Sequence, residues 1–117
     1  MLRICSILVL IFAPLASFAD VSGVVRVIDA DTLDVGATRV RLHAIDAPEQ
    51  DQTCVTEHGL PFACGAWATQ QVSERFEGRD AVCRAVDIDK YNRVVAKCDV
   101  SGMDMGQEIV AQGWAFA

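Results

Sequence analysis

The alternation of apolar and polar residues predicts a protein built mainly of short β-strands. Three β-rich segments follow one another near the start of the chain: 22–28, 32–35 and 38–45. Gly36 and Ala37 form a turn between the second and the third, so the three segments predict a meander. Arg41 and Leu42 should point to opposite faces of the third strand, because successive side chains alternate along a strand.

A helical period replaces this alternation in the middle of the chain. Residues 46–60 are polar and predict a loop, and Pro61 precedes an apolar repeat of one residue in four that ends at Gly78. The repeat comprises Cys64, Ala68, Val72 and Phe76. Such a stripe is typical of a helix that packs on a core.

The last part of the chain predicts a hairpin and a short helix. Segments 81–86 and 94–100 are strand-like and flank the turn DIDKYNR at 87–93. Asp104 and Gln107 then resemble a helix-start cap, and Gly113 ends that helix. The order β, β, β, helix, β, β, helix predicts a mainly β (α+β) domain, a five-stranded Greek-key barrel of the OB type with packed helices.

The first nineteen residues have the layout of a secretory signal. Arg3 precedes an apolar run, and Ser17-Phe18-Ala19 offers a small-x-small cleavage site. A membrane anchor is disfavoured because the run is too short to span about 30 Å of hydrocarbon. We therefore expect residues 1–19 to be a signal peptide and 20–117 to form one secreted or periplasmic domain, without stable membrane association after cleavage.

The charge balance is acidic. Loss of Arg3 leaves nine basic against sixteen acidic residues, a formal charge of −7. Such a surface argues against tight nonspecific wrapping of nucleic acid, because contacts of Lys and Arg with phosphate supply most of that affinity. A small site that holds a metal ion can still act on a phosphodiester, since the ion is then the largest local charge.

Four cysteines remain after the expected cleavage, and an even number in an exported domain predicts disulfides. Three pairings are possible. We favour Cys83 with Cys98, which flank the 87–93 turn almost symmetrically, and Cys54 with Cys64, which would close a short loop.

Two aspartates sit where strands end. Asp31 and Asp46 could meet at one end of a twisted barrel, and two carboxylates at one place repel unless a cation joins them. This makes a calcium site a physical solution. The alternative is that both are solvated turn residues, the commoner fate of an aspartate.

Three further side chains suit phosphate chemistry. Arg41 and Arg93 could each grip phosphate oxygens, and Glu49, which follows Pro48, could take a proton from water. Salt bridges to the many carboxylates are the alternative for the arginines, and a plain surface position is the alternative for Glu49. Neither histidine suits a two-histidine phosphodiesterase, since one lies mid-strand and the other in a polar loop.

The motifs VIDADT, RLHAIDAPE and DKYNR, followed by GWA, resemble the staphylococcal nuclease family in order and spacing, and the likeness runs from residue 23 to 115. The resemblance implies an OB-fold barrel with packed helices and calcium-dependent cleavage of DNA and RNA phosphodiester bonds that leaves 3′ phosphates. By position, Asp31, Asp46 and the backbone carbonyl of Ala47 would ligate Ca²⁺. Arg41 and Arg93 would hold the phosphate.

The same resemblance gives Glu49 the role of general base or water-orienting residue, and Lys90 and Tyr91 a place in substrate binding. Ala30 and Asn92 stand where glycines are common, and Ala47 where some members have threonine. Family members usually continue past GWA into a further helix, which is apparently missing here. We therefore expect a natively short form or a truncated gene model.

The leading hypothesis is a monomeric, secreted, calcium-dependent nuclease that acts on DNA, RNA or both. The alternative is a noncatalytic OB-fold module that binds nucleic acid or a protein. A third possibility is a fragment that does not fold.

Overall fold

The computed structural model describes residues 7–12 and 18–117. The predicted signal peptide falls partly outside these ranges, including Arg3 and Ser17, the first residue of its small-x-small site. Among the described residues, no helix is long and apolar enough to cross a membrane.

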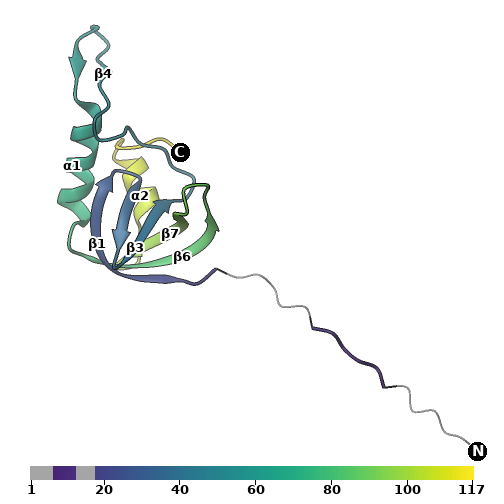
Figure 1. Cartoon of the computed structure of the whole chain (residues 1–117). Coiled ribbons are helices and arrows are strands. Elements are labelled where there is room, and N and C mark those ends of the chain that lie inside the picture. Colours follow the sequence, from purple (N-terminus) through teal and green to yellow (C-terminus); the bar gives the residue numbers. More distant parts are fainter. Residues whose placement is uncertain (1–6, 13–17) are drawn as a thin grey trace, which may run out of the picture.

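Five strands close into a mixed β-barrel, as the sequence predicted (Figure 1). They are β1 (Val21–Asp29), β2 (Thr32–Val35), β3 (Thr38–Leu42), β6 (Asp80–Ile88) and β7 (Val94–Val100). β1 pairs antiparallel with β2 and β6, β2 with β3, and β6 with β7. The barrel closes through a parallel pairing of β3 with β7, in which Arg41 lies opposite Val95.

Two helices pack on the barrel. α1 (Cys64–Phe76) lies against β1, and its predicted stripe is buried, including Val72 and Phe76. α2 (Met105–Ala111) lies against β7. Its predicted cap is present, since the Asp104 carboxylate accepts a hydrogen bond of 2.9 Å from the backbone N–H of Gln107. Both helices thus add apolar side chains to one core.

The inward side chains of all five barrel strands form that core, which includes Leu33, Leu42 and Val100. Leu42 is buried while its neighbour Arg41 is only half-buried, so the predicted alternation is confirmed. Cys83 and Cys98 are fully buried and joined by a disulfide across β6 and β7. Both favoured pairings are confirmed, because Cys54 and Cys64 are also joined.

The structure corrects the predicted elements at three places. The third strand ends at Leu42 rather than at residue 45, because Ala44 has a φ of 61° and turns the chain. The predicted 46–60 loop contains strand β4 (Cys54–Val55), which pairs with β5 (Pro61–Phe62) in a hairpin that projects from the barrel beside α1 (Figure 1). A short strand β8 (Met103–Asp104) also extends the sheet from β7.

Candidate active site

Arg41 is held at the end of β3 by the turn that follows it. Its Nη1 donates hydrogen bonds to the carbonyl oxygens of Leu42, at 3.2 Å, and Ile45, at 2.8 Å. The left-handed backbone of Ala44 brings the Ile45 carbonyl back toward the strand. Because both bonds use the same nitrogen, the remaining N–H donors of the guanidinium are available to other groups.

Asp31 and Asp46 lie on either side of this guanidinium. Nη1 of Arg41 is 3.4 Å from Oδ2 of Asp31, and Nη2 is 3.5 Å from Oδ1 of Asp46. The Asp31 residue is buried, whereas 85% of the Asp46 side chain is exposed. The structure therefore brings the two predicted metal ligands to one cationic group from strand ends fifteen residues apart in sequence.

The two aspartates are fixed in different ways. The Asp31 carboxylate accepts a hydrogen bond from the Thr32 hydroxyl at 3.0 Å and another from the backbone N–H of Ala47 at 2.9 Å. Asp46 is fixed through its backbone, which forms two hydrogen bonds of 2.8 Å with Phe116 near the end of the chain. The Asp31 side chain is thus fixed by two hydrogen bonds besides its ion pair, while the exposed Asp46 carboxylate is bound by Arg41 alone at 3.5 Å.

Arg93 is ordered by Asp89 across the β6–β7 turn. The Asp89 carboxylate accepts a hydrogen bond of 2.7 Å from Nε of Arg93 and bonds of 2.9 Å from the backbone N–H groups of Arg93 and Tyr91. Desolvation raises the pKa of the Asp89 carboxyl, but the bonds from Arg93 and Tyr91 together outweigh it, and the pKa lies below its usual value. The turn therefore carries an ionised carboxylate that orients Arg93.

The same turn carries the two residues predicted to contact substrate. The Tyr91 side chain is exposed, with the Lys90 ammonium 5.1 Å and the Arg93 guanidinium 5.3 Å from its ring centre. Asn92 has a φ of 63° at this turn, a conformation that asparagine adopts more readily than most residues. The turn therefore exposes an aromatic ring with two positively charged side chains beside it.

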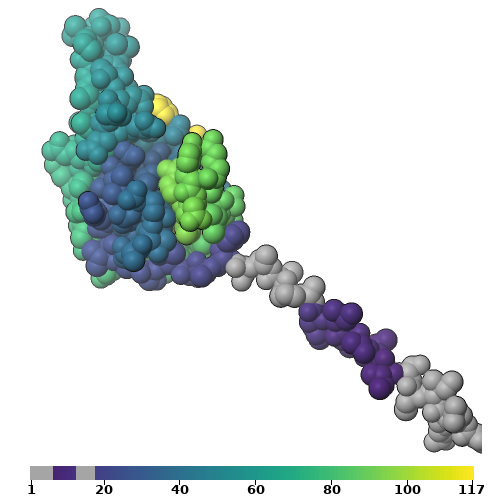
Figure 2. Space-filling model, in the orientation of Figure 1, coloured from purple at the N-terminus to yellow at the C-terminus, as the bar shows by residue number. Residues whose placement is uncertain are grey.

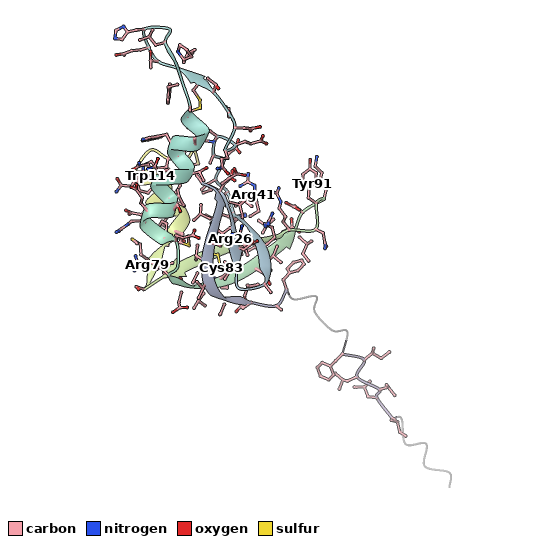
Figure 3. All side chains as sticks on the ribbon, turned by 60° about the vertical axis from the view of Figure 1, so that its left-hand side comes forward. Arg26, Arg41, Arg79, Cys83, Tyr91 and Trp114 are labelled. Carbon is pink, nitrogen blue, oxygen red and sulfur yellow. A yellow bond between two sulfur atoms is a disulfide. The ribbon has the colours of Figure 1, made fainter. Side chains whose placement is uncertain are left out.

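The two arginines and this turn line one hollow of about 640 Å³. Its lining includes Arg41, Lys90, Tyr91 and Arg93. Arg41 lies opposite Val95, and Arg93 is two residues before Val95, immediately ahead of the first residue of β7. Strand geometry then separates the two Cα atoms by about 8 Å. Figure 2 shows the β6–β7 turn as a light-green lobe beside the β2–β3 surface, and Figure 3 shows Arg41 and Tyr91 on the same side of the barrel.

Glu49 does not line this hollow. It lies in the loop after Asp46, and within the described part of the chain its exposed carboxylate has no hydrogen bond or ion pair. Its backbone is held by Gln52 and packs closely against Gly65, the second residue of α1. Of the predicted site residues, Asp31 and Asp46 thus lie within 3.5 Å of Arg41. Arg41 and Arg93 line the same hollow, and Glu49 lies on the loop that follows Asp46.

The carboxylates suit a hard cation only with help from other oxygens. Among the described residues, no three acidic, histidine or cysteine side chains converge as a metal-binding group. Asp31 and Asp46 nevertheless share a cation already, the Arg41 guanidinium, so positive charge is favoured between them. Two carboxylates, backbone carbonyls and water form a donor set that calcium accepts.

Sequence reasoning missed Asp89, Gln52, Gly65 and Phe116. Asp89 had a local signal, since it lies four residues before Arg93 in a turn. Gln52 binds the backbone of Glu49, three residues away, through its own side chain and backbone, and that turn has no sequence signature. Gly65 and Phe116 act through backbone contacts with segments distant in sequence, and no local pattern marks them.

Comparison with known proteins places the chain in a family. Over 93 residues it is 31% identical to the succinoglycan biosynthesis protein ExoI of Rhizobium meliloti (strain 1021). The aligned region covers 78% of this chain and 49% of that protein. Over 104 residues it is 33% identical to an uncharacterized endonuclease of Escherichia coli, covering 84% and 61% respectively, and equally to its counterpart in Escherichia coli O157:H7. The chain thus spans about half to three fifths of the length of these relatives. Residues 39–117 match the sequence model described as staphylococcal nuclease homologue, and the chain belongs to that family.

Proposed function

We propose that this chain hydrolyses phosphodiester bonds of DNA or RNA in a calcium-dependent reaction. The observation that carries the proposal is the hollow that Arg41 and Arg93 both line, at one end of the parallel β3–β7 pair and next to the carboxylates of Asp31 and Asp46. The relatives described as endonucleases support the same reaction class.

The two arginines suit an anion with several oxygens. Each guanidinium can donate two parallel hydrogen bonds to a phosphate, and together they offset negative charge that builds in the transition state. Lys90 adds a third positive charge, and the exposed face of Tyr91 offers a surface on which a base can stack. Asp87 and Asp89 also line the hollow, so its three cations exceed its carboxylates by one, whereas the whole chain has a formal charge of −6.

Asp31, Asp46 and the backbone carbonyl of Ala47 would hold Ca²⁺. When bound, the ion would supply positive charge beside the phosphate and polarise its oxygens. With the ion in place, Arg41 would no longer be the only cation beside the two carboxylates, and its N–H donors could bind the substrate phosphate. Among the described backbone groups, none donates a hydrogen bond to the Ala47 carbonyl, which leaves that oxygen free to act as a ligand.

Glu49 supplies the proton acceptor. Its carboxylate is exposed and free of cationic partners, so it can accept a proton from water or orient the attacking water. Its loop begins beside the hollow, since Ile45 lines the hollow and the Asp46 carboxylate lies 3.5 Å from Arg41.

The two disulfides support an oxidising compartment, and we propose a secreted or periplasmic, monomeric enzyme. The test uses the oxidised protein with fluorogenic single-stranded DNA and RNA, in calcium and then in excess chelator. Cleavage that needs calcium and leaves 3′ phosphates is expected. Cleavage unaffected by the chelator would overturn the proposal, and calcium-dependent binding without cleavage would instead support the noncatalytic module.

A further inference from the structure

Glu49 depends on its backbone for its position. Its carboxylate forms no hydrogen bond or ion pair with the described part of the chain, and the residue is exposed. When no hydrogen bond or ion pair holds a side chain, its average position is set by the position of its Cα atom. The groups that bind the Glu49 backbone therefore decide where its carboxylate lies.

Gln52 binds that backbone on both sides. The side-chain Oε1 of Gln52 accepts a hydrogen bond of 3.3 Å from the N–H of Glu49, and the backbone N–H of Gln52 donates a bond of 2.9 Å to the carbonyl oxygen of Glu49. The first bond needs a side chain with an acceptor at the length of glutamine. The second fixes the turn from residue 49 to residue 52.

Gln52 is in turn anchored to α1. Its carbonyl oxygen accepts a hydrogen bond of 3.1 Å from the N–H of Gly65. The sulfur of Cys64 lies 3.5 Å from the same oxygen, but it belongs to the disulfide with Cys54 and has no proton to donate. The disulfide closes the chain from Cys54 back to the first residue of α1, so the turn cannot move away from the helix.

A third contact ties this turn to the barrel. The Asp29 carboxylate, at the end of β1, accepts a hydrogen bond of 2.9 Å from the N–H of Gln50. The Glu49 backbone is therefore held between β1 and α1, two elements that pack directly on each other.

We propose that Gln52 is a positioning residue for Glu49 and that its side-chain carbonyl sets the efficiency of the proton transfer. This inference rests on the proposed function. Misplacement of a reacting group by about 1 Å can cost about a hundredfold in rate. Loss of the Gln52 acceptor should therefore reduce kcat and leave KM nearly unchanged, because Gln52 lies outside the hollow that holds the phosphate.

The experiment compares Gln52→Leu and Gln52→Glu with a matched control, Gln70→Leu. Gln70 is also an exposed glutamine, and among the described residues its side chain bonds only to Glu74, one turn along α1. We expect Gln52→Leu to lower kcat about tenfold to a hundredfold. Gln52→Glu keeps an acceptor oxygen at the same side-chain length and should restore most of the lost kcat, again with KM nearly unchanged.

A second readout measures position without catalysis. Amide hydrogen exchange at Glu49 should accelerate in Gln52→Leu and stay unchanged in Gln70→Leu, with the same melting temperature for both. If the natural chain cleaves DNA and Gln52→Leu matches it in kcat and in exchange, the inference fails while the proposed function stands. If the natural chain does not cleave, the proposed function fails first, and with it the catalytic role of Gln52.

Discussion

The backbones of Asp46 and Phe116 form a two-bond bridge although seventy residues separate them in the sequence. Each N–H donates to the other carbonyl oxygen at 2.8 Å, while 76% of the Phe116 surface is exposed. Phe116 therefore contributes through its main chain rather than its ring. The end of the chain positions one of the two proposed metal ligands.

This bridge predicts that Phe116→Pro weakens calcium binding. Proline has no N–H, so one of the two bonds is lost, at a cost of about 0.5–1.5 kcal/mol. Calcium affinity measured by isothermal titration calorimetry should fall about twofold to tenfold. Phe116→Ala keeps both bonds and is the control; equal weakening by both substitutions would show that the ring, not the bridge, matters.

Replacement of Arg93 by lysine tests whether the rate depends on the positive charge at this position or on the planar guanidinium. Arg93→Lys keeps the positive charge but loses the planar fork that binds two phosphate oxygens at once. Steady-state rates with a single-stranded DNA substrate should fall roughly 10²- to 10³-fold. Arg84 is exposed on β6, and Arg84→Lys, the control, should change the rate less than twofold. If Arg93→Lys lowers the rate by less than severalfold, Arg93 is not part of the site.

The parts of this structure that the sequence predicts are those set by local pattern. Alternation along β3 places Arg41 and Leu42 on opposite faces, and the symmetric spacing of Cys83 and Cys98 about a turn places them across a hairpin. Both signals need only a few neighbouring residues. The order of strands and helices follows from the same kind of pattern.

The rest depends on contacts between distant segments. Nothing about alanine indicates the left-handed backbone of Ala44, which ends β3 and returns the Ile45 carbonyl to Arg41. The hairpin of β4 and β5 has only two residues per strand, too few for a period to appear. The bridge to Phe116 becomes visible only once the barrel has closed.

Gly65 is a test of the packing between α1 and the loop that carries Glu49. A Cβ at this position would overlap the carbonyl oxygen of Glu49 and approach Gln50, both of them main-chain groups that cannot rotate away. Gly65→Ala should therefore lower the melting temperature and the rate together. The loss of free energy should be about 1–3 kcal/mol, the usual cost of overpacking.

Gly106 in α2 provides the matched control. A Cβ there meets the Asp104 carboxylate at 3.4 Å and the Ile45 side chain at 3.7 Å, both ordinary contacts. Gly106→Ala should be neutral or stabilise the protein by about 0.5–1 kcal/mol, as alanine does within helices. Thermal unfolding followed by circular dichroism checks both variants, and equal stability of Gly65→Ala and the natural chain would contradict the close approach.

The Asp89 turn should loosen in acid. Because the pKa of Asp89 is lower in the folded protein than the usual value of 3.8, the stability contributed by its carboxylate is fully present above that value and is lost as the pH falls through the lower, folded value. Protonation removes the charged acceptor for the Arg93 side chain and for two backbone N–H groups. Amide exchange of Tyr91 and Arg93 should therefore accelerate below pH 3.8 relative to the β6 and β7 amides of the barrel. Asp89→Asn lacks the titrating group and should show faster exchange already at neutral pH, with no further relative change in acid; a variant that keeps the acid transition would assign it to another carboxylate.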